Sequence, residues 1–359
     1  MKNIIIIAFI SVFFFFLGWQ ANDKLIYKGK KEFKNNNTNN IEKFENLSRY
    51  SIEKLSNYSI TVKHLLITDL LTETGKYSSY KFILEFAPDP EKNHVKKVTG
   101  RITIPKNTQG TKAIVIMLRG YIDKTIYKTG DGSRNAANFL SENGYITIAP
   151  DFLGYGESDM ESSNIFEARF QTYTTVLALL NLFENEINSE KIIAKDLSSE
   201  IVNLLAQKNQ VFIWGHSNGG QIALTILAIT GKNYPTVLWA PVTKPFPYSV
   251  LYYTDESVDG GKFIRKELAK FEKENQVDLF SFTNYLDKIN AEIQIHQGGK
   301  DNAVPVAWNN EIVIKLKQKN KNVSYYIYQS VDHNMRPEWE TVMKKTLDFY
   351  ESRLDNIKI

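Results

Sequence analysis

The stretch V-F-I-W-G-H-S-N-G-G-Q-I-A-L, residues Val211 to Leu224, contains a short apolar run, a G-x-S-x-G turn and an apolar-periodic segment. This pattern is typical of a strand that enters a sharp turn and continues as a helix. The glycines allow a tight bend, so the hydroxyl of Ser217 should stand above a sheet, at the positive end of a helix. A serine placed in this way can attack a carbonyl group.

A serine hydroxyl is a weak nucleophile, so it needs a histidine base and an acid that orients that base. In sites of this kind the acid and then the histidine follow the serine, each in a loop after a later strand. Asp301 follows a predicted strand at 291–297, and His333 follows the last predicted strand, Val323–Tyr328. Asp332 is a weaker alternative for the acid, because adjacent side chains of an extended segment point apart.

The other histidines fit structural roles. His216 is the variable residue of the turn, His296 lies within a predicted strand, and His64 and His94 precede the parallel part of the sheet. No pair of histidines has the spacing of metal ligands, so we expect neither a metal nor a cofactor.

The tetrahedral oxygen formed in acyl transfer needs two hydrogen-bond donors. The first is expected to be the backbone N–H of Asn218, directly after the nucleophile. The second is expected after the apolar run 112–118, where the backbone N–H of Tyr121 is our candidate. The competing interpretation of Arg119-Gly120-Tyr121 is an ordinary turn at the end of a strand.

The loop 151–159 resembles the D-x-x-G-x-G-x-S motif of α/β-hydrolases, and 282–306 resembles the stretch that leads to the acid in prolyl oligopeptidases. From about Lys112 to its end, the chain is similar to the catalytic domain of the prolyl oligopeptidase family. This resemblance implies an α/β-hydrolase fold, with a mostly parallel sheet, flanking helices and a short lid at about 241–290. It also implies a serine hydrolase that acts on ester, peptide or amide bonds through an acyl-enzyme.

The chain departs from that family in its N-terminal part, which is too short for the family's β-propeller. A peptidase is therefore one prediction, and a carboxylesterase is the alternative. A non-catalytic exported binding protein of the same fold is the alternative from another class. The lid carries four aromatic residues that either line an apolar substrate pocket or pack the lid onto the body: Phe246, Tyr248, Tyr252 and Tyr253.

The N-terminal part fits an exported protein. Residues 1–21 combine a basic start with the apolar run Ile4–Leu17, which predicts a signal peptide or an uncleaved membrane anchor. Residues 22–46 are rich in Lys and Asn and predict a flexible linker, and 47–359 form the catalytic domain. We expect an extracytoplasmic protein, secreted or tethered, that contacts the membrane only through this segment.

Composition narrows the possible partners. The net charge of +4 is spread along the chain, which is weak for a nucleic-acid binder, and the absence of cysteine excludes disulfides and a thiol nucleophile. The expected partner is a small ester or a short peptide substrate. Alternating residues within Ile60–Lys106 predict antiparallel strands, and Ile165–Phe183 predicts an amphipathic helix that flanks the sheet.

Overall fold

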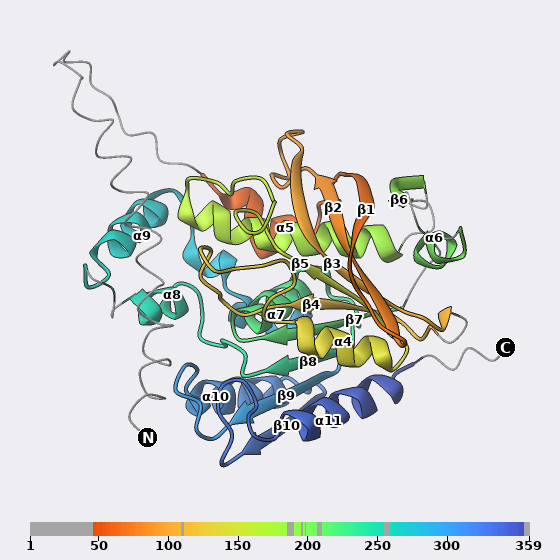
Figure 1. Ribbon diagram of the computed structural model, residues 1–359. Helices are drawn as coiled ribbons and strands as arrows, with labels where there is room; N and C mark the ends of the chain where they lie inside the picture. Colours follow the sequence, from red (N-terminus) through yellow and green to blue (C-terminus); the bar gives the residue numbers. More distant parts are fainter. Residues whose placement is uncertain are drawn as a thin grey trace.

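The computed structural model describes residues 46–108, 111–184, 190–194, 197, 199–206, 210–254, 257 and 259–354. Within these residues one sheet has the strand order β10-β9-β8-β7-β4-β5-β3-β2-β1-β6 (Figure 1). The strands are β1 Val62–Glu73, β2 Tyr77–Phe86, β3 Lys96–Pro105, β4 Ile114–Leu118, β5 Ile146–Pro150, β6 Ile192–Ala194, β7 Val211–His216, β8 Thr236–Trp239, β9 Ile293–Gly298 and β10 Val323–Tyr328.

The sheet has a parallel part and an antiparallel part. The strands from β10 to β5 are parallel to one another, whereas β5, β3, β2 and β1 pair antiparallel. The antiparallel strands predicted before the parallel part are therefore present, and the short edge strand β6, which the sequence did not predict, pairs parallel with β1. The parallel strand ends meet at one edge, which is where loops of such a sheet carry ligand and catalytic groups.

Helices cover both faces of the sheet. The side chains of β4 alternate: Ile114, Ile116 and Leu118 join the larger core cluster, and Val115 and Met117 join the smaller one. The larger cluster includes α5, α7 and α10, and the smaller includes α4 and α11. The helices are α3 Ile52–Leu55, α4 Arg134–Glu142, α5 Ile165–Glu184, α6 Ser199–Ala206, α7 Asn218–Thr230, α8 Tyr248–Thr254, α9 Lys262–Glu274, α10 Val306–Gln318 and α11 Trp339–Glu351. The expected fold class is confirmed.

The predicted lid region, 241–290, contains α8, α9 and three short 3-10 helices. These are η4 Val277–Phe280, η5 Phe282–Asn284 and η6 Leu286–Lys288. Phe246 is buried and contacts the rings of Phe166, Phe170, Phe271 and Phe280. This aromatic cluster attaches the region to α5. Of the two interpretations of the lid aromatics, packing of the lid onto the body therefore applies to Phe246. Tyr248 and Tyr252, by contrast, are exposed.

The prediction that α5 is amphipathic is wrong. Buried residues of α5 lie around its whole circumference, and they include the polar Glu167, Gln171 and Thr174. The reason is that chain distant in sequence covers the face that would otherwise meet solvent. An aromatic cluster from the 241–290 region covers one part, and the segment 46–55 covers another.

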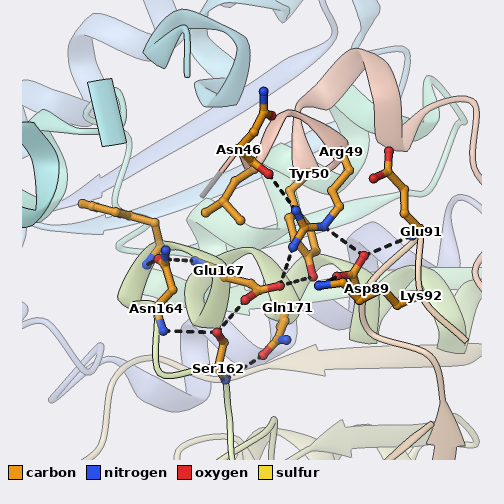
Figure 2. Close-up of polar contacts among 12 residues, drawn as sticks. Asn46, Arg49, Tyr50, Asp89, Glu91, Lys92, Ser162, Asn164, Glu167 and Gln171 are labelled. Atoms are coloured by element: carbon orange, nitrogen blue, oxygen red, sulfur yellow. Dashed lines mark hydrogen bonds and ion pairs between the residues drawn. The ribbon is translucent and has the colours of Figure 1, made fainter. Parts of the chain in front are cut away.

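The segment 46–55 is held by a buried cluster of charges (Figure 2). Arg49, in the 3-10 helix η1 Ser48–Tyr50, lies between two carboxylates, with Nε 2.9 Å from Asp89 and Nη2 2.8 Å from Glu167. Tyr50 also donates to Glu167, at 3.0 Å, and Ser162 donates to its other carboxylate oxygen, at 2.5 Å. The three charged side chains are each less than a tenth exposed as residues, so the cluster ties the segment to α5 and to the chain after β2.

The described residues include no helix that is both long enough and apolar enough to cross a membrane. The predicted signal or anchor segment 1–21 and the linker, up to residue 45, lie outside the described residues.

Replacement of Arg49 by Met should lower the free energy of unfolding by about 3–5 kcal/mol, because it leaves the carboxylate of Glu167 buried without a cation and leaves Asp89 only its ion pair with the exposed Lys92. Urea unfolding near neutral pH measures this change. The matched control is Lys63→Met, which removes a cation from the largely exposed pair with Glu85 and should cost less than about 1 kcal/mol. Equal effects of the two substitutions would show that the Arg49 cluster does not hold the segment.

Candidate active site

Ser217 occupies a strained turn between β7 and α7. Its φ of 55° and ψ of −120° lie in a region that residues with side chains rarely adopt. Two backbone hydrogen bonds from the chain around the end of β8 hold it: Ser217 N–H donates to Trp239 O at 2.9 Å, and Val242 N–H donates to Ser217 O at 3.0 Å. The predicted nucleophile therefore stands at the parallel edge of the sheet, directly before the first turn of a helix.

The glycines around Ser217 are required by close backbone contacts. A Cβ on Gly219 would lie 1.9 Å from Leu118 O, and a Cβ on Gly215 would lie 2.8 Å from Gly219 O. Any side chain at Gly219 would push α7 away from the end of β4. The glycines of the G-x-S-x-G turn thus allow β4, β7 and α7 to meet at the nucleophile.

The predicted acid and base are hydrogen bonded to each other. His333 Nδ1 lies 2.9 Å from Asp301 Oδ2, and the Asp301 side chain has no exposed surface. Because a carboxylate accepts, Nδ1 carries the proton and Nε2 of the neutral ring is free to accept one. The other carboxylate oxygen of Asp301 accepts from the backbone N–H groups of Ala303 and Val304, both at 2.8 Å.

These hydrogen bonds decide the charge of Asp301. Burial raises the pKa of its carboxyl, but the hydrogen bond and charge of His333, together with the amides of Val304 and Ala303, outweigh burial and lower that pKa below its ordinary value. Asp301 is therefore ionised at neutral pH and can stabilise a positive charge on His333.

A chain of buried amides supports Asp301 from behind. Gln297 Nε2 donates to Asp301 Oδ2 at 3.0 Å, Asn309 Nδ2 donates to Gln297 Oε1 at 2.5 Å, and Thr243 donates to Asn309 Oδ1 at 2.9 Å. Gln297 and Asn309 are completely buried. This chain joins the acid to α10 and to the segment that follows β8, the same segment that holds Ser217.

His333 lies beside the residue that precedes the nucleophile. His216 Nε2 donates to the carbonyl oxygen of His333 at 3.0 Å, and the two rings are 4.7 Å apart between centroids. Burial, followed by the nearby His333, lowers the pKa of His216 to about 3. His216 is thus a neutral, hydrogen-bonded group that positions the loop of His333, in line with the structural role expected for it.

Asp332 stabilises a backbone turn instead of pairing with the His333 ring. Its Oδ1 accepts from the backbone N–H groups of Asn334 and Arg336, at 2.8 and 2.9 Å. These bonds close the turn in which His333 sits. The choice of Asp301 over Asp332 as the partner of His333 agrees with the geometry.

The loop after β4 lies against the nucleophile. A Cβ on Gly120 would be 3.0 Å from Ser217 Cβ. Arg119 is buried and donates from Nη1 to Gly120 O and from Nη2 to Asp151 O, both at 2.9 Å. Because the peptide is planar and trans, fixing the Gly120 carbonyl also fixes the opposite direction of the Tyr121 N–H. Arg119 therefore orients the predicted second oxyanion donor.

Aromatic rings hold the guanidinium of Arg119. It lies 4.0 Å from the ring centroid of Tyr155 and 4.6 Å from that of Tyr127. Tyr127, Thr129 and Thr99 donate to the carboxylate of Asp151, which is completely buried. Asp151 thus anchors the start of the glycine-rich loop 151–159 to β3 and to the chain between β4 and α4.

The other histidines lie away from the triad. His296 is completely buried, donates from Nε2 to Gln294 Oε1 at 2.8 Å and accepts at Nδ1 from the Tyr328 hydroxyl at 2.9 Å. Burial, and then the charge of Lys345, lower the pKa of His296 to about 3. Within the described part of the chain, no group of three His, Cys, Asp or Glu residues could hold a metal ion.

Comparison with known proteins agrees with this architecture. Residues 198–356 match the model of the prolyl oligopeptidase family, and residues 113–235 match that of the alpha/beta hydrolase fold. Acetyl xylan esterase 1 from Thermoanaerobacterium is similar with 14% identity over 83% of this chain and 98% of its own, at a TM-score of 0.52. An esterase from Pyrococcus furiosus has 15% identity over 83% and 93%, at a TM-score of 0.50. No curated protein sequence matches the chain.

The chain therefore has the α/β-hydrolase fold. Within that class its C-terminal part is similar to the prolyl oligopeptidase family, and a hydrolase, either an esterase or a peptidase, is the type of enzyme that the matches support.

Replacement of Gly120 by Ala should lower kcat by about tenfold to a hundredfold, because the new methyl group presses on Ser217 and displaces the adjacent peptide. Hydrolysis of a nitrophenyl acyl ester measures the rate, and thermal unfolding shows whether the fold is intact. Gly75→Ala is the control, since a Cβ there meets no atom within 4 Å. An unchanged kcat would mean that this loop does not form part of the site.

Stability should fall as the pH decreases from about 6.5 to about 3, because the unfolded chain protonates His216 and His296 while the folded chain keeps both neutral. Each histidine contributes a slope of about 1.4 kcal/mol per pH unit in that window. In the His296→Gln variant the slope should be smaller by about that amount, even where the substitution also lowers the free energy of unfolding at neutral pH.

Urea unfolding at a series of pH values measures the slope. His94→Gln, at an exposed position, should leave the slope unchanged. If His296→Gln had the wild-type slope, His296 would not be held neutral in the folded chain.

Proposed function

We propose that the protein is a serine hydrolase that cleaves acyl esters through an acyl-enzyme on Ser217. The observation that carries this proposal is the pairing of an ionised, buried Asp301 with Nδ1 of His333, in a loop hydrogen bonded to the residue before Ser217. In this state Nε2 of His333 is the acceptor that a serine nucleophile requires. The strained turn at Ser217 supports the same assignment.

In the first half of the reaction, Ser217 Oγ attacks the carbonyl carbon while His333 Nε2 takes the hydroxyl proton. The carbonyl oxygen becomes an oxyanion that accepts from the backbone N–H groups of Asn218 and Tyr121. Collapse of the intermediate breaks the bond to the leaving group, which receives the proton from His333. Asp301 stabilises the charged imidazole during these steps.

In the second half, water replaces the leaving group. His333 takes a proton from the water as the oxygen attacks the acyl carbon, and it returns a proton to Ser217 Oγ when the acyl bond breaks. The products are a carboxylic acid and the free enzyme.

Short peptides or aminoacyl amides are the second candidate substrates, because the match to the prolyl oligopeptidase family spans the segment with all three triad residues. In the described chain before β4, the strands β1 to β3 extend the catalytic sheet itself. A parallel comparison of acyl esters and aminoacyl amides on the purified protein measures the ratio of their kcat/KM values. Faster amide cleavage would replace the ester assignment with a peptidase.

We also propose, from residues 1–21 of the sequence, that the enzyme acts outside the cytoplasm on small molecules. Fractionation of cells that produce the full chain tests this location.

Ser217→Ala should lower kcat for acyl esters by about a millionfold, because no other group can form the acyl-enzyme. A fluorophosphonate probe should label the wild-type protein and not this variant. Ser330→Ala, an exposed serine close to the His333 loop, is the matched control and should keep both labelling and turnover. Wild-type turnover by Ser217→Ala would rule out the mechanism, and a wild-type protein that neither reacts nor turns over would favour a binding protein of the same fold.

A further inference from the structure

A cavity lies beside His333, on the face of the sheet covered by α4 and α11. The cavity, of about 560 Å³, opens between the ends of β7 and β8, the loop before α4 and the loop after β10. This volume falls in the range of about 300–1,000 Å³ typical of small-molecule sites. Its lining includes His216, which precedes the nucleophile, and Asn334, which follows His333. The cavity therefore adjoins the triad and extends away from it.

Aromatic rings form a continuous wall from the triad into this cavity. The ring of His216 lies 4.7 Å from His333 and 6.2 Å from Trp214. Trp214 then contacts Trp239 at 5.3 Å, and Trp239 contacts Trp339 at 6.3 Å. All three tryptophans line the cavity. Trp214 and Trp239 are almost completely buried in the smaller core cluster, so Trp339, which is partly exposed, offers the indole surface that a planar ring can contact by stacking or edge-to-face.

Two hydrogen-bond donors of the lining residues have no acceptor in the described chain. The indole N–H of Trp214 and the Nε–H of Arg134 are buried, and neither has a hydrogen-bond partner among the described residues. Buried donors without an acceptor are costly, so a site that keeps them is expected to receive an acceptor from elsewhere. Both atoms have almost no accessible surface, so an acceptor on a bound ligand reaches them only when the lining side chains shift.

The charge of the lining also favours an anion. The charge of Arg134 is paired with Asp131, its Nη2 being 2.6 Å from the carboxylate. Arg336 lies exposed at the rim, and in the described part of the chain its guanidinium forms no ion pair. Two guanidinium groups and one carboxylate leave a net charge of +1 in the lining. Guanidinium groups bind carboxylates by paired hydrogen bonds.

We propose that this cavity binds a planar aromatic ring that carries a carboxylate, with the ring against Trp339 and the carboxylate near Arg336. The binding site itself does not depend on turnover. Its use as the subsite for an aromatic part of the substrate or product rests on the proposed function, because only then does the adjacent His333 act on the bound molecule.

Tryptophan fluorescence tests the proposal directly, because three of the five tryptophans of the chain line the cavity. Benzoate should quench the fluorescence of the full-length protein in a saturable manner. Two analogues separate the contributions: benzamide keeps the ring without the charge, and cyclohexanecarboxylate keeps the charge without the aromatic ring. Both should bind about tenfold more weakly than benzoate, or worse.

Substitutions then locate the site. Arg336→Gln should weaken benzoate about tenfold and leave benzamide unchanged, whereas Lys317→Gln, an exposed cation on α10, should change neither. Trp339→Leu should remove most of the quenching. Trp308→Phe should retain it, because Trp308 lies with Tyr252 and Tyr253 and does not line the cavity.

Three results would overturn the proposal: no saturable quenching by benzoate, equal affinity for benzamide, or an unchanged affinity in Arg336→Gln. Loss of the signal in Trp308→Phe would place the binding elsewhere and count against it equally. The Ser217→Ala variant should bind benzoate with the wild-type affinity, so a failure of the proposed catalysis leaves this result intact. A failure of binding likewise leaves the labelling of Ser217 untouched.

Discussion

The backbone conformation of Ser217 is the constraint on which the catalytic architecture depends. A non-glycine residue at φ 55° costs about 1–3 kcal/mol, and it persists only where the surroundings fix it. Here Trp239, the last residue of β8, accepts from the N–H of Ser217, and Val242, in the segment after β8, donates to its C=O. The missing side chain of Gly219 lets β4 approach α7. Because Thr243 of the same segment reaches Asp301 through Asn309 and Gln297, one stretch of chain fixes the nucleophile and the acid together.

The sequence allowed the prediction of groups that lie at the ends of strands. Ser217, Asp301 and His333 each follow an apolar run, and the chain order of such sites is fixed, so pattern and order predict them as the candidate triad. Arg119 and Asn309 were missed because their roles come from contacts across the fold. An arginine after a strand gives no signal that its guanidinium will bind the Gly120 carbonyl, and an asparagine inside a helix gives none that it will support an acid.

The failed prediction for α5 has a related cause. A helical period indicates which face is apolar, but it does not show which other segments will later cover the polar face. Glu167 looks like a solvent-facing residue in the sequence, yet Arg49, Tyr50 and Ser162 surround it in the fold. The aromatic residues of the predicted lid also differ from one another: Phe246 packs against α5, whereas Tyr248 is exposed.

Hydrogen-bond satisfaction distinguishes the two sides of the site. Around Asp301 every buried donor has its acceptor, as expected for groups whose task is to hold a geometry. Around the cavity, Trp214 and Arg134 keep buried donors without partners in the described chain. Native proteins rarely leave such groups unpaired, so each of them calls for an explanation. The amide chain behind Asp301 therefore holds the geometry of the site, and the tryptophan-lined side is where we propose that a ligand binds.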